Sequence, residues 1–184
     1  VSSRGRQACA ISLSEAQEVG TESHNMFDFI ITNRVTSVDL TPLKEQSRVA
    51  VSNFYRFLDL NKFFNPDLKS ETILAESVVY SKKHKFAGTL DRIMFLQNTL
   101  YLIDWKTSKQ FSDENKLQLN AYYYALTEMN ESGIINIDQL PEKLMLVRLD
   151  KEKEFNPKKD VKIFEPSKKK FKAFLGLLQY IKNK

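Results

Sequence analysis

Apolar residues recur at the spacing of a helix face in four parts of the chain. The stripe nearest the start is imperfect and contains Gly20, whereas the stripe around Phe54 is regular. The spacing predicts helices over residues 14–31, 42–57 and 112–129, and a fourth helix from residue 166 onward. The apolar stripe of this last helix consists of Phe171, Phe174, Leu175, Leu178 and Ile181.

The period changes to that of strands where β-branched, aromatic and aliphatic residues become dense. Gln97, Asn98 and Thr99 form a short polar break within this region, as expected for a hairpin turn. A charged loop that contains Pro157 joins the last two apolar segments. The predicted strands cover residues 72–80, 86–96, 100–105, 143–149 and 161–165.

The order of these elements predicts the fold class. Two helices precede a three-strand meander, which is followed by a helix, two strands and a final helix. This order favours an α/β fold with one core, and a length of 184 residues fits one domain. We expect that domain over residues 14–184, after a poorly specified, frayed start over residues 1–13.

Composition narrows the class of protein further. Hydrophobic residues make up 42% and charged residues 28%, which is ordinary for a globular protein. No segment approaches the roughly 20 continuous apolar residues of a membrane span, and no signal-peptide layout opens the chain. Cys9 is the single cysteine, which excludes an internal disulfide and a four-cysteine cluster. An intracellular compartment (cytoplasm, an organelle or a virus-infected cell) is expected, without association with a membrane.

Charge is distributed unevenly around the net value of +5. Residues 139–184 hold 13 Lys or Arg against 6 Asp or Glu, whereas residues 1–138 hold 15 against 17. Four lysines gather at the start of the last predicted helix, namely Lys168, Lys169, Lys170 and Lys172. A basic region beside an acidic body suits a polyanion-binding surface next to a cation-binding centre. A solvated surface that only maintains solubility explains the same lysines.

Candidate chemistry lies on two neighbouring predicted strands. Period two places Asp104 and Lys106 on the same face of one strand, and Asp91 lies across the hairpin on the other. Two carboxylates on rigid strands make an oxygen-rich site for Mg²⁺ or Mn²⁺, beside which a lysine can orient water and offset phosphate charge. The alternative is structural, since an aspartate near a strand end often caps a turn or pairs with a lysine.

Four motifs along residues 20–126 carry a resemblance to a known family. Gly88-Thr89-Leu90-Asp91, a turn, and then Ile103-Asp104-Trp105-Lys106 resemble the pattern of the PD-(D/E)xK nuclease superfamily. The closest resemblance is to its RecB-type nuclease group, which includes the mitochondrial genome maintenance exonuclease. The other motifs that resemble this group, in its order, are Gly20-Thr21-Glu22-Ser23-His24, Ala75-Glu76-Ser77-Val78 and the segment from Gln118 to Tyr122.

The resemblance implies a restriction-endonuclease-like core, in which helices flank a mixed central sheet, and an Mg²⁺- or Mn²⁺-dependent site. Its metal ligands would be His24, Asp91, Asp104 and the backbone carbonyl of Trp105. Lys106 would position or activate the attacking water, and the catalytic set would be Asp91, Asp104 and Lys106. Glu76 is either a further ligand or the partner of a nearby Lys or Arg.

The resemblance also implies substrate contacts, and it has two departures. Gln118 and Tyr122 are one helical turn apart, so both can contact the DNA backbone. The group often has a glutamate one turn after the motif histidine, where this chain has the shorter Asp28, so a direct role for Asp28 is not expected. The cysteines that hold an iron–sulfur cluster in some members are absent, which places the chain with the cluster-free members.

The expected function is metal-dependent hydrolysis of DNA by an exonuclease, on single strands or DNA ends, in repair, recombination or replication. A structure- or sequence-specific endonuclease is the alternative, because the same core serves restriction enzymes. A different class is a nucleic-acid-binding module without catalysis, or a subunit that depends on a helicase or another replication protein. No motor motif such as G-x-x-x-x-G-K-[ST] is present in the chain.

Overall fold

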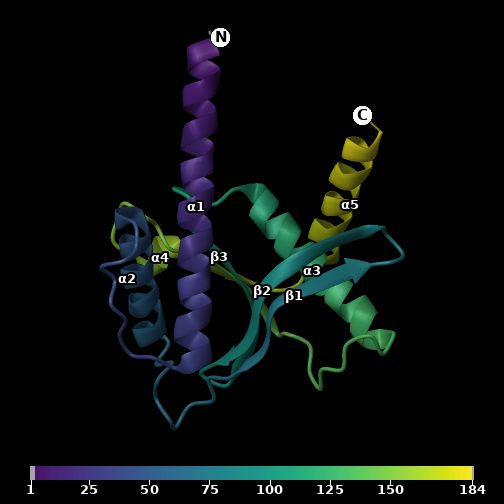
Figure 1. Cartoon of the computed structure of the whole chain (residues 1–184). Helices are drawn as coiled ribbons and strands as arrows, with labels where there is room; N and C mark the ends of the chain where they lie inside the picture. The colour runs from purple at the N-terminus through teal and green to yellow at the C-terminus, as the bar shows by residue number, and fades with distance from the viewer. Residues whose placement is uncertain (1–2, 184) are drawn as a thin grey trace.

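A computed structural model describes the main chain of residues 3–183 and the side chains of residues 13–183 (Figure 1). The described chain contains one mixed sheet of five strands in the order β1-β2-β3-β4-β5. The β3–β4 pair is parallel, whereas the other three pairs are antiparallel. The strands are β1 Thr72–Ser81, β2 Phe86–Leu96, β3 Thr99–Lys106, β4 Lys143–Arg148 and β5 Val161–Phe164. The predicted α/β fold with a mixed central sheet is confirmed.

The helices are α1 Ser3–Asn33, α2 Glu45–Leu60, α3 Asp113–Glu131, α4 Pro157–Asp160 and α5 Lys168–Lys182. The start of α1 differs most from the sequence prediction, because the helix begins at Ser3 rather than Ser14. The other predicted helix boundaries differ by one to three residues; α2, for example, begins at Glu45 rather than Pro42 and ends at Leu60 rather than Phe57. The loop predicted around Pro157 contains the one-turn helix α4. Asn156 caps the start of this helix, because its side chain accepts a hydrogen bond of 3.1 Å from Lys158 N.

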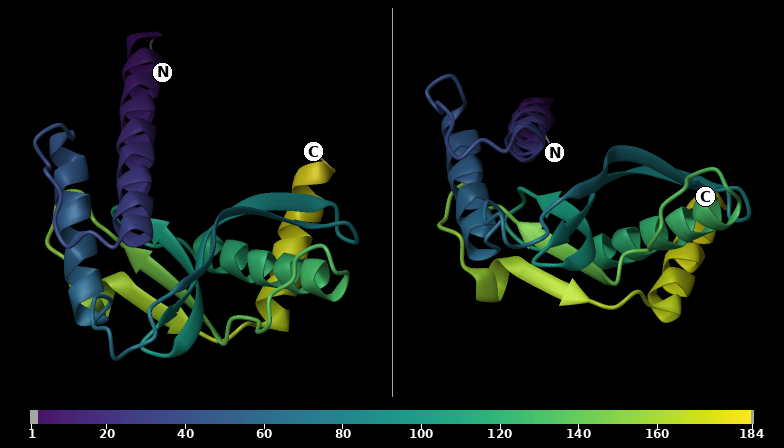
Figure 2. Two further views of the ribbon diagram at one scale, coloured as in Figure 1. Left: turned by 60° about the horizontal axis from the view of Figure 1, so that its bottom comes forward. Right: turned by 90° about the horizontal axis from the view of Figure 1, so that it is seen from below.

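Helices cover both faces of the sheet, and each face has its own apolar core (Figure 2). On one face, α1 and α2 pack on strand residues that include Met94, Ile103 and Trp105. On the other face, α3 packs on strand residues that include Leu102 and Leu144. Strands buried on both sides read as continuous apolar runs, which explains the dense apolar segments of the sequence.

The turn between β2 and β3 was predicted at Gln97, Asn98 and Thr99. In the structure, Gln97 and Asn98 are its two central residues, and β3 already begins at Thr99. Both central residues have positive φ angles, 49° and 67°. Such a two-residue turn matches the twist of paired strands and fixes their register. That register determines which residues of β2 and β3 meet at the site described below.

The apolar stripe predicted for the last helix lies on α5 and is only partly buried. None of its described residues is fully buried, and Ile181, a member of the predicted stripe, is 61% exposed. Phe171 still stacks on Tyr124 of α3, with ring centroids 4.5 Å apart. α1 and α5 project from the sheet in the same direction, on either side of it (Figure 1).

Candidate metal centre and active site

Alternation along β3 separates its apolar and charged side chains. Trp105 is buried on the side of α1 and α2, where its ring packs edge-on against Phe54 and Phe57 at centroid distances of 5.3 and 5.5 Å. Because successive side chains of a strand point to opposite faces, burial of Trp105 turns Asp104 and Lys106 away from this cluster. The aromatic packing therefore orients Asp104 and Lys106, for which the sequence predicted a catalytic role.

Asp91 occupies the place where β2 and β3 separate. The main-chain pairing of these strands ends at Arg92 and Ile103. Beyond that point, Asp91 Oδ2 accepts a hydrogen bond of 2.7 Å from the backbone N–H of Trp105. The side chain thus replaces the missing main-chain acceptor, and the carboxylate is held at the gap between the strands.

His24 enters the site from α1. Phe27, three residues later, is completely buried and packs at 4.5 Å from Phe54, which fixes the rotation of the helix. His24 Nδ1 lies 3.9 Å from Asp91 Oδ2. Burial lowers the pKa of His24, although the nearby Asp104 and Glu76 carboxylates oppose this shift. A neutral imidazole is the form that can bind a metal ion.

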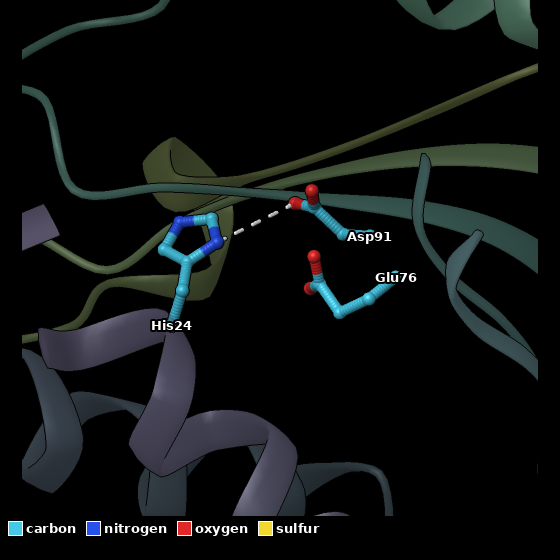
Figure 3. A group of neighbouring side chains, drawn as sticks. All are labelled: His24, Glu76 and Asp91. Carbon is cyan, nitrogen blue, oxygen red and sulfur yellow. Dashed lines mark ion pairs between the residues drawn. The ribbon is translucent and has the colours of Figure 1, made fainter. Parts of the chain in front are cut away.

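Glu76 completes a compact group with these two residues (Figure 3). β1 pairs Ala75 with Arg92 and Ser77 with Leu90, so Glu76 lies at the level of Asp91. Its φ angle of +44° is unusual for a residue other than glycine inside a strand, and such conformations gather at functional sites. One ligand atom each from His24, Glu76 and Asp91 lies within 4.8 Å of the others. Among the described residues, this is the group with metal-ligand spacing.

Asp104 lies beside this group and is held by Lys106. Lys106 Nζ donates a 3.0 Å hydrogen bond to Asp104 Oδ1 and lies 2.8 Å from Oδ2. The second contact has the distance of an ion pair without hydrogen-bond geometry, so buried Oδ2 lacks a hydrogen-bond donor among the described residues. Burial raises the pKa of both Asp91 and Asp104 to about 6, and their mutual repulsion adds to the shift for Asp104.

Gln118 and Tyr122 on α3 extend the site from Lys106. Gln118 Oε1 accepts a hydrogen bond of 3.2 Å from Lys106 Nζ, and Gln118 Nε2 donates one of 3.0 Å to the Tyr122 hydroxyl. The Tyr122 ring covers Gly88, where an added Cβ would stand 2.4 Å from Cε1 of the ring. Gly88 is therefore a positioning residue that gives Tyr122 its place. Its part in the G-x-x-D pattern was the sequence signal for this role.

Arg92 is a buried cation that the sequence analysis did not single out. Its guanidinium forms an ion pair with Asp28 and donates a hydrogen bond of 2.9 Å to Thr72 Oγ1. Only 1% of Arg92 is exposed, so Asp28 on α1 is the counterion that makes burial of this charge tolerable. Asp28 thus ties α1 to β2 one turn after His24. Arg92 belongs to no motif in the sequence, but a charged residue next to Asp91 in an apolar strand is a sign of a buried ion pair.

A comparison with protein families agrees with this arrangement. The PD-(D/E)XK nuclease superfamily matches the sequence over residues 14–184. The chain belongs to this superfamily. Its members are nucleases, and they generally use divalent metal ions. The comparison with curated proteins found no match.

The donor set fits the metal ion that the superfamily uses. The half-buried Asp91, the buried Asp104, the exposed Glu76 and the imidazole of His24 surround the point where β2 and β3 separate. Oxygen-rich sites with one imidazole suit Mn²⁺, and carboxylate sites suit Mg²⁺. The buried Asp104 Oδ2 atom without a hydrogen-bond donor provides a further acceptor at this place. Asp91 and Asp104 are costly to ionise in the absence of a cation, which is the electrostatic condition of a metal site.

The structure brings the predicted site residues close together, with Glu76 near His24 and Asp91 and with Asp104 paired to Lys106. Glu76, predicted either as a further metal ligand or as the partner of a Lys or Arg, lies in one group with His24 and Asp91. Asp104, which the sequence placed first, is paired with Lys106 and stands beside the compact trio. Trp105 contributes its backbone N–H to Asp91 and a main-chain contact to His24. Its carbonyl remains a predicted ligand.

Proposed function

We propose that the protein is an Mg²⁺- or Mn²⁺-dependent deoxyribonuclease that removes nucleotides from DNA ends and prefers single strands. The observation that supports it best is the convergence of His24, Glu76 and Asp91 next to the Asp104–Lys106 pair. This set has the ligands of a cation site and, at its edge, an ammonium group. A PD-(D/E)XK nuclease needs both to hydrolyse a phosphodiester.

The proposed roles follow from these contacts. His24, Glu76, Asp91 and Asp104 would hold the cation, which would supply Lewis-acid polarisation of a phosphate oxygen when bound. Lys106, anchored by Asp104 Oδ1 and Gln118 Oε1, orients the attacking water and offsets the charge that develops on the phosphate. The water oxygen loses a proton to solvent and bonds to phosphorus as one P–O ester bond breaks, and the departing sugar oxygen takes up a proton. Gln118 and Tyr122 contact the phosphate backbone and keep it in line with Lys106.

The preference for ends and single strands is supported by the elements around the site. α1 packs on one face of the sheet and α5 packs against α3 on the other, and both helices project from the sheet in the same direction (Figure 1). Four of the first five residues of α5 are lysines that can neutralise phosphates, namely Lys168, Lys169, Lys170 and Lys172. Two projecting helices, one of which begins with four lysines, are suited to bind one flexible DNA strand rather than the wider double helix. A helicase or another replication or recombination protein is the partner that we propose would supply such strands.

Labelled linear single strands and covalently closed single-stranded circles distinguish an exonuclease from an endonuclease and from a binding module. In Mg²⁺ or Mn²⁺, we expect loss of the linear strands and survival of the circles, with no loss in EDTA. Cleavage of circles would instead identify an endonuclease that uses the same centre. Absence of cleavage from both substrates would favour a binding module, or a nuclease that requires its partner.

Substitution of Lys106 tests the assigned chemistry. We expect Lys106→Ala to lower the cleavage rate by at least about a hundredfold, because a positioned donor at the reacting phosphate contributes this much. DNA affinity, measured in EDTA, should change little. Undiminished cleavage by this variant would contradict the mechanism.

No helix within residues 3–183 combines the length and the apolar character that crossing a bilayer requires.

A further inference from the structure

A cavity between α3 and α5 opens beside the active site. Its volume is about 300 Å³, at the lower end of the range for small-ligand pockets. Its lining residues are Glu114, Asn115, Leu117, Gln118, Phe174 and Leu177. We propose that this cavity binds the base of the nucleotide next to the scissile phosphate. The inference rests on the proposed nuclease function and adds a binding site for an unpaired base to it.

Gln118 connects the cavity to the chemistry. The same side chain lines the cavity and accepts the 3.2 Å hydrogen bond from Lys106 Nζ. A second hydrogen bond, to the Tyr122 hydroxyl at 3.0 Å, fixes the orientation of the amide. Only the Gln118 amide separates Lys106 from the cavity. When a phosphate contacts Lys106, a neighbouring base therefore lies within reach of the cavity.

The wall contributed by α5 has the character of a stacking surface. Phe174 is half-buried, and Leu177 is 39% exposed at the rim. Phe174 is held by an edge-on contact with Phe86, whose ring centroid lies 5.0 Å away. A base can stack on such an apolar wall whatever its identity, since every base has a π face. The site therefore favours unpaired bases over a particular sequence.

Hydrogen bonds hold α5 in place on both sides of the residues that line the cavity. At its start, Ser167 N donates a hydrogen bond of 2.7 Å to Asn120 Oδ1 of α3. Near its end, Lys182 Nζ donates one of 2.8 Å to the Lys85 carbonyl. Leu177 lies between these two attachments. The helix can thus leave apolar residues exposed without separating from α3, and the proposed base pocket gives this exposure a function.

The volume excludes paired DNA from the cavity. A base enters only when it leaves its stack and its pairing partner, which requires a few kcal/mol in a duplex and much less in a single strand. The pocket therefore provides a physical reason for single-strand preference at this centre. The four lysines of α5 act on phosphates of every strand, whereas the pocket acts only on strands with an unpaired base next to the cut.

The test compares wild type with Phe174→Leu, Leu177→Ala and the control Gln179→Ala, which truncates an exposed residue of the same helix. Cleavage kinetics are measured on an ordinary strand and on one that carries an abasic nucleotide next to the scissile phosphate. We expect Phe174→Leu and Leu177→Ala to raise KM on the ordinary strand by about tenfold and to change kcat by less than about twofold. The control should match wild type, and on the abasic strand all four proteins should behave alike.

Equal losses on the ordinary and abasic strands, or no loss on either, would overturn the base pocket. A second readout does not depend on catalysis. In EDTA, wild type should raise the fluorescence of 2-aminopurine placed next to the cleavage position, because the base leaves its stack to enter the pocket, and Phe174→Leu should lose this rise. A rise without any cleavage would contradict the nuclease function and support the pocket, whereas cleavage without a rise would do the reverse.

Discussion

Asp104 carries a buried negative charge that weakens the fold when no metal is bound. Its side chain is 5% exposed, and burial raises its pKa from 3.8 to about 6. A shift of this size corresponds to about 3 kcal/mol, since one pKa unit is about 1.4 kcal/mol. Asp104→Asn removes the charge but also removes the partner of Lys106. We therefore expect this variant to be more stable than wild type by about 1–3 kcal/mol in EDTA at about pH 8.

The pH dependence of this difference has a definite sign. Above about pH 6, Asp104 is ionised in both the folded and the unfolded protein, so the full destabilisation is present. Below about 3.8 it is protonated in both states, and the destabilisation disappears. The stability advantage of Asp104→Asn should therefore shrink as the pH falls from about 8 to about 4.5.

Thermal unfolding measures this prediction. For a domain of this size, 1 kcal/mol shifts Tm by about 2–4 °C, so Asp104→Asn should unfold about 2–12 °C above wild type in EDTA at about pH 8. Saturating Mn²⁺ should raise the Tm of wild type and reduce the difference. Asp138→Asn, which neutralises an exposed aspartate, is the control and should leave Tm unchanged. A less stable Asp104→Asn protein at about pH 8 would refute the reasoning.

Three further predictions concern neighbouring parts of the site. Gly88→Ala should lower the cleavage rate at least about tenfold by displacing Tyr122. The control Gly176→Ala, whose added Cβ meets no atom within 4 Å, should retain full activity, and equal rates for the two variants would contradict this role of Gly88. At limiting Mn²⁺, cleavage should fall as the pH drops through about 6, and more Mn²⁺ should move the midpoint lower; a fixed midpoint would exclude proton–metal competition. Neutralising the four lysines at the start of α5 should weaken DNA binding and flatten its salt dependence, and an unchanged slope would assign them to solubility.

Much of the fold was predictable because it depends on local patterns. The apolar runs of the strands, the polar turn at Gln97 and Asn98, and the stripe of α2 around Phe54 specify their elements within the chain itself. The charged end of β3 and the motif around His24 likewise pointed to residues that the structure places close together, and their chemical roles stay predictions. The predictions of the fold succeeded where period and residue type determine the structure without help from distant segments.

The remaining features depend on contacts between distant segments. The ion pair between Asp28 and Arg92 joins residues 64 positions apart, and nothing local to either predicts it. The positive φ of Glu76 arises where β1 passes the separated strands, so its closeness to His24 follows from tertiary structure. The exposure of Ile181 likewise depends on where α5 leaves α3, which an apolar stripe alone does not determine.

The most direct measurement of the central claim is an anomalous-scattering map of crystals grown with millimolar Mn²⁺. We expect one strong peak within about 2.5 Å of His24, Asp91 and at least one oxygen of Glu76 or Asp104. The same map shows which of these two carboxylates binds the cation. A crystal without a peak at this place, or with Mn²⁺ bound only elsewhere, would contradict the metal centre on which the proposed function depends.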